Sequence, residues 1–185
     1  VNVVPGIAFY LVGLPDSAIK ESSYRIAAAL QNNKYNFPGK KITINMAPAD
    51  LRKEGSAYDL TLALGILAAS GQINHSAIGE YIIMGELSLD GSLQPIKGAL
   101  PIAIKAKEEG FKGFILPKQN VKEAAIVSDL EVFGVSNITE VIQFFDKNVP
   151  LERTVINVRE EFYNDLEHLE HDFADVKGQE SIKRC

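Results

Sequence analysis

The segment LTLALGILAA, at residues 60–69, constrains the fold of this chain more than any other part of the sequence. It is apolar on nearly every side of a helix, so it predicts a central helix that other elements surround. Asp59 precedes the segment as a candidate N-terminal cap, and Gly71 follows it as a terminator. A chain of 185 residues is long enough to bury a sizeable core around such a helix.

The N-terminal part of the chain supplies elements that could surround this helix. The segment IAFYLVGL, at residues 7–14, is almost wholly apolar and predicts a strand buried on both faces. Ile19, Ile26 and Leu30 then recur at helical spacing among charged residues, which predicts an amphipathic helix. The segment KITINMA, at residues 41–47, alternates apolar and polar side chains and predicts a strand with one buried face.

The C-terminal part alternates strands and helices. The segment YIIMGELSLDGSLQPI, at residues 81–96, predicts a hairpin that turns on the two residues Asp90 and Gly91. We expect further strands at 113–117 and 131–135, and helices at 99–109, 120–129 and 137–147. Asn137 followed by Glu140 is the pattern of a capping box at the last of these helices. The chain is therefore expected to have an α/β (α+β) fold with a mixed sheet.

Charge and cysteine content restrict the class of protein. The net charge is −5, with a pI of about 5.3, whereas free-standing nucleic-acid-binding domains are usually basic. Any contact with nucleic acid would then be made by a local patch. The single cysteine, Cys185, permits no disulfide within the chain and fits a reducing compartment. With no apolar stretch of about 18 residues, we expect a cytoplasmic protein without a membrane partner.

Two candidate chemical sites can be read from the residues, and both are weak. Ser56 could be a nucleophile with Lys97 as its base, because a desolvated lysine can accept a proton. The favoured interpretation is that Ser56 only ends a loop before the core helix. His168 and His171 could bind a metal on one helix face, but they lie among acidic residues typical of a charged connector. We therefore expect no metal site, and no complete phosphate-binding loop occurs in the sequence.

Several longer motifs resemble one protein family. They are VGLPDSAIKES, ITINMAPADLRKEGSAYDLTLALGILAASGQI, GELSLDGSLQPIKGALPIAIKAKEEGFKGFILPKQN and FADVKGQESIKR. In this order they resemble the bacterial magnesium-chelatase-related AAA+ ATPases of the ComM or YifB type, over nearly the whole chain. The resemblance implies the fold shared by the proteolytic domain of Lon and the C-terminal domain of RadA, which is named after the second domain of a small-subunit ribosomal protein.

The resemblance also implies a domain organisation. Residues 1–147 would form the Lon-protease-like domain without its first strand, and residues 148–172 an acidic connector. Residues 173–185 would begin the AAA+ ATPase module, in which Val176, Gly178 and Gln179 lie near the adenine of ATP. The resemblance implies no cofactor for this part of the protein, but ATP and Mg²⁺ for the longer parent.

The comparison with Lon predicts that the catalytic dyad is lost. Aligning KEGSAYD with the nucleophile loop of Lon places Ala57 at the serine position and Ser56 one residue early. Aligning PIKGAL in the same way places Leu100 where Lon has its lysine, and Lys97 about one helical turn before it. A leucine cannot act as a base, so we expect a non-catalytic domain of an ATPase.

The resemblance finally implies partners. Proteins of this type are associated with DNA branch migration, so the parent is expected to assemble into a ring, of six subunits, around DNA. A dense run of lysines is the sequence's candidate for phosphate contacts: Lys105, Lys107, Lys112, Lys118 and Lys122. Two alternatives stay open, namely a Ser–Lys peptidase with the displaced pair Ser56 and Lys97, and the motor subunit of a true metal chelatase.

Overall fold

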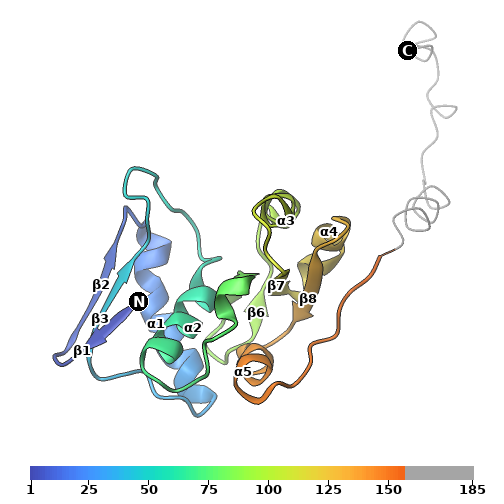
Figure 1. Ribbon diagram of the computed structural model, residues 1–185. Coiled ribbons are helices and arrows are strands. Elements are labelled where there is room, and N and C mark those ends of the chain that lie inside the picture. Colours follow the sequence, from blue (N-terminus) through green and yellow to red (C-terminus); the bar gives the residue numbers. More distant parts are fainter. Residues whose placement is uncertain (157–185) are drawn as a thin grey trace, which may run out of the picture. The chain divides into compact units, whose positions relative to one another are not determined.

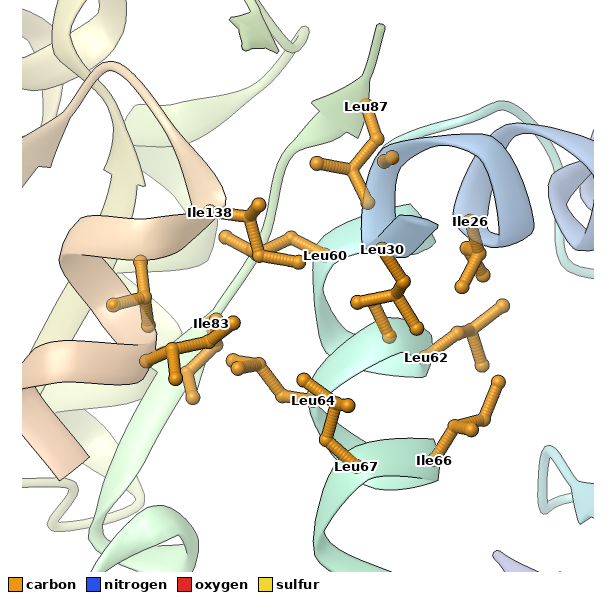
Figure 2. Packing of buried hydrophobic residues seen from close by; sticks show 14 of the residues in the cluster. Ile26, Leu30, Leu60, Leu62, Leu64, Ile66, Leu67, Ile83, Leu87 and Ile138 are labelled. Carbon is orange, nitrogen blue, oxygen red and sulfur yellow. The ribbon is translucent and has the colours of Figure 1, made fainter. Parts of the chain in front are cut away.

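Helix α2 (Asp59–Ala69) is the predicted central helix, and it lies inside the larger of two hydrophobic cores. The computed structural model describes residues 1–156. Figure 2 shows Leu62 and Ile66 on the side of α2 that faces the neighbouring helix, and Leu64 on the side that faces the strand carrying Ile83. Because α2 is covered on both sides, nearly every position in it is apolar, which confirms the prediction from residues 60–69.

The first sheet is built from the N-terminal part of the chain (Figure 1). Strands β1 (Asn2–Val4), β3 (Lys41–Asn45) and β2 (Ala8–Val12) lie in that order, with β2 parallel and β1 antiparallel to β3. Helix α1 (Ser17–Asn32) connects β2 to β3 and packs beside α2 on one face of this sheet. The alternating segment 41–47 therefore forms the predicted strand with one buried face, through Ile42 and Ile44.

The prediction that residues 7–14 are buried on both faces is wrong. Phe9 and Leu11 point into the larger core, but the side chains of Tyr10 and Val12 are 51% and 50% exposed. In the described part of the chain β2 is an edge strand, and both helices of this half pack on its inner face. The apolar run at residues 7–14 does not show which elements will cover each face of the strand. The spacing of its apolar residues therefore could not reveal that one face of β2 is exposed.

The second sheet is parallel throughout. Strands β4 (Tyr81–Ile83), β7 (Gly113–Pro117) and β8 (Glu131–Val135) lie in the order β4-β7-β8. Strand β7 is buried along its whole length because helices cover both faces of the sheet. Two short 3₁₀ turns, η1 (Ile78–Glu80) and η2 (Lys118–Asn120), precede β4 and follow β7.

The helices around the second sheet divide between the two cores. Helices α3 (Ala99–Glu108) and α4 (Val121–Ala125) form the smaller core with one face of the sheet, and α5 (Ile138–Lys147) joins the larger core on the other face. Helix α5 starts with the predicted capping box of Asn137 and Glu140. The helix predicted at 120–129 is shorter than expected and ends at Ala125.

The predicted hairpin is correct only in its second half. Residues 81–83 form β4 of the second sheet, and the hairpin consists of β5 (Glu86–Leu87) and β6 (Leu93–Gln94). The backbone nitrogen of Ser88 still donates to the carbonyl of Ser92, so the turn between them has three residues, not two. Gly91 takes a φ of 89° at its end, a backbone conformation that favours glycine.

The chain leaves this unit along β8. The backbone nitrogen of Thr154 donates to the carbonyl of Val132, and Leu151 packs against the larger core, so the compact unit extends to Val155. With parallel and antiparallel pairs and five α-helices in the described range, the predicted α/β (α+β) class with a mixed sheet is confirmed. The domain boundaries at 147 and 172 stay predictions, since residues 157–185 lie outside the described range.

Candidate functional site

The loop that carries Ser56 is held in place by Asp16. One carboxylate oxygen of Asp16 accepts from the backbone nitrogen of Ile19 at 2.9 Å and so caps α1. The other oxygen accepts from the backbone nitrogen of Gly55 at 2.9 Å. The backbone nitrogen of Asp16 in turn donates to the carbonyl of Lys53. One side chain therefore fixes both the start of α1 and the loop at 53–57.

These hydrogen bonds make Asp16 a source of stability that depends on pH. The amide of Gly55, followed by that of Ile19, lowers the pKa of Asp16 below its ordinary 3.8. A carboxylate with a lowered pKa stabilises the folded state above that value, and this contribution is lost as the pH falls through the lowered pKa. We expect Asp16→Ala to reduce the free energy of unfolding at pH 7 by about 1–2 kcal/mol.

Urea denaturation of both proteins between pH 7 and pH 2 tests this prediction. The difference between wild type and Asp16→Ala should be constant at neutral pH and shrink once the pH is below 3.8. Asp16→Asn is the matched variant, because an asparagine can still cap α1, and it should lose less. A difference that persists unchanged to the lowest pH would contradict the role given to the carboxylate.

Ser56 is hydrogen-bonded to a carboxylate and not to the ammonium group of a lysine. Its hydroxyl donates to a carboxylate oxygen of Glu86, which lies on β5, and the side chain of Ser56 is partly buried. The carboxylate of Glu86 fixes the orientation of the hydroxyl by accepting this hydrogen bond. Catalysis by a serine nucleophile requires in addition positioned donors for the oxyanion of the tetrahedral intermediate.

Beside this pair lies a buried ion pair between Arg25 and Asp59. The Nε and one terminal nitrogen of Arg25 donate to the two carboxylate oxygens of Asp59, at 2.6 and 3.0 Å. The backbone nitrogen of Leu87 also donates to Asp59, whose side chain is only 1% exposed. Burial raises the pKa of Asp59, while the hydrogen bonds from Arg25 and Leu87 oppose that rise. The bidentate contact locks α1, the start of α2 and β5 together.

The sequence suggested that Asp59 caps α2, and this prediction is wrong. The cap position is Tyr58, which makes no side-chain hydrogen bond to the helix, and Asp59 is the first residue of α2. Its carboxylate is already taken by Arg25 and by the amide of Leu87. Arg25 offers the carboxylate two charge-assisted hydrogen bonds in a fixed geometry, and both oxygens of Asp59 are used by them.

Within residues 1–156, no hydrogen bond joins Ser56 to Lys97. Lys97 is exposed in the connection between β6 and α3, whereas the hydroxyl of Ser56 is engaged by Glu86. At the positions that match Lon, the carbonyl of Ala57 accepts from Gly85 at 2.8 Å, and the backbone nitrogen of Leu100 donates to Glu123 at 3.0 Å. Both residues therefore have structural contacts. The assignment of Ser56 and Lys97 stays a prediction.

No cluster of metal-binding side chains occurs within the described residues. His75 lies exposed in a loop, while His168 and His171 fall outside the described range, as do Val176, Gly178 and Gln179. The predicted adenine contacts are thus untested. Among the residues described, no helix has the length and apolar character needed to cross a bilayer.

Three of the five lysines proposed for phosphate contacts lie close to carboxylates. Lys105 pairs with Glu109 at 2.9 Å and with Glu108 at 3.3 Å. Lys107 lies 3.4 Å from Asp129, and Lys112 lies 3.9 Å from Glu80. Exposed pairs of this kind contribute little to stability, but they offset the local positive charge. This surface is therefore less favourable for a phosphate backbone than its sequence suggests.

Sequence reasoning missed the three residues that organise the site: Arg25, Glu86 and Asp16. Each belongs to an element whose local pattern was interpreted correctly or nearly so, but each makes its main contact with a residue far along the chain. Periodicity reports on neighbours within a helix or strand and carries no information about such pairs. The acidic character of position 59 was the one signal, since a buried carboxylate requires a partner.

A family model and several curated proteins match this chain, and they point to the same family. Residues 1–120 match the family described as subunit ChlI of Mg-chelatase. Competence protein ComM of Haemophilus influenzae is 39% identical over 184 residues, which are 100% of this chain and 36% of ComM. YifB of Escherichia coli is 38% identical over 181 residues, which are 98% of this chain and 34% of YifB. The chain thus spans about a third of the length of these relatives.

Similarity to Lon is also found, over a shorter range. Lon protease 2 of Bacillus subtilis is 29% identical over 114 residues, or 60% of this chain and 20% of that protease. The resemblance drawn from the motifs at residues 12–120 and 173–184 is confirmed by these comparisons. The match to the family model covers residues 1–120, which is well over half of this chain. The chain therefore belongs to the family of the ChlI subunit of Mg-chelatase, with relatives of the ComM and YifB type.

Proposed function

We propose that this chain is the N-terminal, non-catalytic domain of a magnesium-chelatase-like AAA+ ATPase that acts on DNA. The parent would be a cytoplasmic ring of six subunits that uses ATP and Mg²⁺ as a branch-migration motor or helicase. Val176, Gly178 and Gln179 would contribute to its adenine site. In this arrangement the domain described above assists ring assembly or the engagement of DNA, and performs no covalent chemistry of its own.

The observation that carries this proposal is the match with ComM along the full length of the chain. Competence is the ability of a bacterial cell to take up DNA, so the name of that relative points to DNA as the polymer that the parent handles. Identity of 39% spread over 184 residues supports a shared role better than a match confined to one motif. Because the chain spans 36% of ComM, the activity of the whole protein belongs to the parent and not to this part alone.

The geometry around Ser56 supports the non-catalytic role. The serine faces Glu86 and lies near the Arg25–Asp59 pair, so its surroundings hold two carboxylates and a cation that is already engaged. A Ser–Lys mechanism requires a lysine within hydrogen-bond reach of the hydroxyl, and Lys97 is exposed to solvent instead. Contacts that could have served chemistry in this loop are used to hold α1, α2 and β5 together.

ATP hydrolysis by the full-length parent, measured with and without branched DNA, tests the proposal. We expect DNA to stimulate hydrolysis, and deletion of residues 1–155, the compact unit, to abolish that stimulation while basal hydrolysis remains. Absence of any DNA effect on the full-length protein would refute the role in DNA processing. Stimulation that survives the deletion would show that this domain does not couple DNA to the motor.

The similarity to Lon protease 2 favours a peptidase as the second candidate. Incubation of the 185-residue chain with a casein substrate tests it, with Ser56→Ala as the matched variant. We expect no cleavage by either protein. Cleavage that disappears in Ser56→Ala would establish the peptidase instead. The family name also keeps the chelatase motor as an alternative, which stimulation of ATP hydrolysis by a porphyrin-binding partner, and not by DNA, would support.

A further inference from the structure

The outer face of the first sheet is open in the described part of the chain. Side chains on a strand alternate between faces, and Phe9 and Leu11 point inward, so Ala8, Tyr10 and Val12 point outward. The pairing register places Lys41, Thr43 and Asn45 of the central strand beside them. Helices α1 and α2 pack on the opposite, inner face (Figure 1). We call these outward residues of β2 and β3 the open face.

The open face combines an aromatic ring with a lysine. The ammonium group of Lys41 lies over the ring of Tyr10, 5.6 Å from its centre, and the tyrosine is 51% exposed. None of the three strands contains an aspartate or a glutamate, in a chain whose net charge is −5. Lys40 and Lys41 are also absent from the ion pairs within residues 1–156. The open face therefore carries one cation and no carboxylate from its own strands, in an acidic chain.

This composition fits a nucleic acid better than a dry protein interface. A protein that covered the open face would bury Lys41 and Asn45 at the two ends of the central strand, where an unpaired charge or amide is costly. A single strand of nucleic acid offers a phosphate to the lysine, polar base edges to the amide and a base to stack on the tyrosine. The flexible stem of Lys41 allows its ammonium to move from the ring to a phosphate when a base stacks there.

We infer that the open face binds single-stranded DNA, with Tyr10 stacking on a base and Lys41 contacting a phosphate. Strand β3 has five residues and spans about 17 Å, which is room for two or three nucleotides. The inference rests on the proposed function, since that function makes DNA the polymer in question. It places the DNA contact on the first sheet, away from the lysine run around α3, whose charges are offset by carboxylates.

Fluorescence anisotropy of a labelled oligothymidylate of about 20 nucleotides, titrated with the 185-residue chain, tests the inference. We expect Tyr10→Ala to weaken binding about tenfold and Tyr10→Phe to retain it, because phenylalanine keeps the stacking surface. Lys41→Gln should reduce the dependence of log affinity on log salt concentration by about 0.7. The matched controls are Tyr24→Ala, an exposed tyrosine on α1, and Lys105→Gln, and both should bind like wild type.

Three results would overturn the inference. The first is no binding of the oligothymidylate by the wild-type chain, and the second is an equal effect of Tyr10→Ala and Tyr24→Ala. The third is a wild-type chain that self-associates in sedimentation and is dissociated by Tyr10→Ala without any DNA binding, which would make the open face a contact between copies. Circular dichroism confirms that each variant is folded, which is expected because the substituted side chains are exposed.

The inference and the proposed function can fail separately. If DNA stimulates ATP hydrolysis by the parent and Tyr10→Ala binds oligothymidylate normally, the open face is the wrong surface but the proposed function stands. If the open face binds oligothymidylate and the parent's hydrolysis ignores DNA, the surface is right and the motor role is wrong. An RNA of matching length is titrated in parallel, and tighter binding of the RNA than of the DNA would overturn the assignment to DNA.

Discussion

Arg25→Met is expected to lower the free energy of unfolding by about 3–5 kcal/mol. The substitution leaves the carboxylate of Asp59 without its bidentate partner at a position where its side chain is 1% exposed. Attraction between buried opposite charges rarely exceeds the cost of taking both from water, but removing Arg25 leaves only the amide of Leu87 to offset the cost of burying the carboxylate. Urea denaturation at pH 7 measures the effect, provided that the slope against denaturant is unchanged.

Two variants show whether the loss comes from the buried charge. Arg52→Met breaks the pair with Glu54, in which both side chains are at least 67% exposed, and should change stability by no more than about 1 kcal/mol. Asp59→Asn combined with Arg25→Met removes the orphaned charge and keeps an acceptor for the amide of Leu87, so it should recover part of the loss. An Arg25→Met effect as small as that of Arg52→Met would contradict this account.

Gly13→Ala is the second substitution from which we expect a large effect, a loss of about 3 kcal/mol or more. Gly13 has a φ of 111°, and a Cβ added there would lie 2.1 Å from the backbone oxygen of Met46. Alanine is strained at this φ, and the obstructing atom is backbone, which cannot move aside as a flexible side chain would. The change would push β2 away from the end of β3, where Met46 donates to Val12.

Gly79→Ala is the matched control for this prediction. Its backbone has no positive φ and nothing lies within 4 Å of the added Cβ, so alanine should be neutral or stabilise slightly. Thermal denaturation of the two variants beside wild type gives the comparison. Similar melting temperatures for both variants would contradict the prediction, because they would show that the backbone near Gly13 and Met46 can accommodate the added Cβ without loss of stability.

Elements whose surroundings are uniform could be predicted from the sequence. Helix α2 is covered on both sides, so its composition alone indicates a central position. The capping box of α5 depends only on Asn137 and Glu140, which are three residues apart, so it could also be predicted from the sequence. Strand β2 shows the limit, because its apolar run is the same whether one face or two are covered, and the outcome depends on where α1 and α2 pack.

The candidate site was harder to predict than the fold. The sequence singled out Ser56 and Asp59, but their partners Glu86 and Arg25 lie 30 and 34 residues away along the chain. The hairpin illustrates the same difficulty on a smaller scale, since Asp90 and Gly91 marked a turn correctly but not its length. Contacts of this kind are decided by how sheets and helices assemble, and no local spacing records them.

The path of the chain beside β8 has a mechanical consequence. Thr154 is bonded to Val132 and the segment pairs antiparallel to β8 through Arg153 and Phe133, with Leu151 inserted against the core. A pulling force applied to the chain after residue 156 would therefore load these few contacts first, and β8 only after they had separated. If the parent converts ATP hydrolysis into movement, this short pairing is the first part of the domain that has to separate before force is applied to β8.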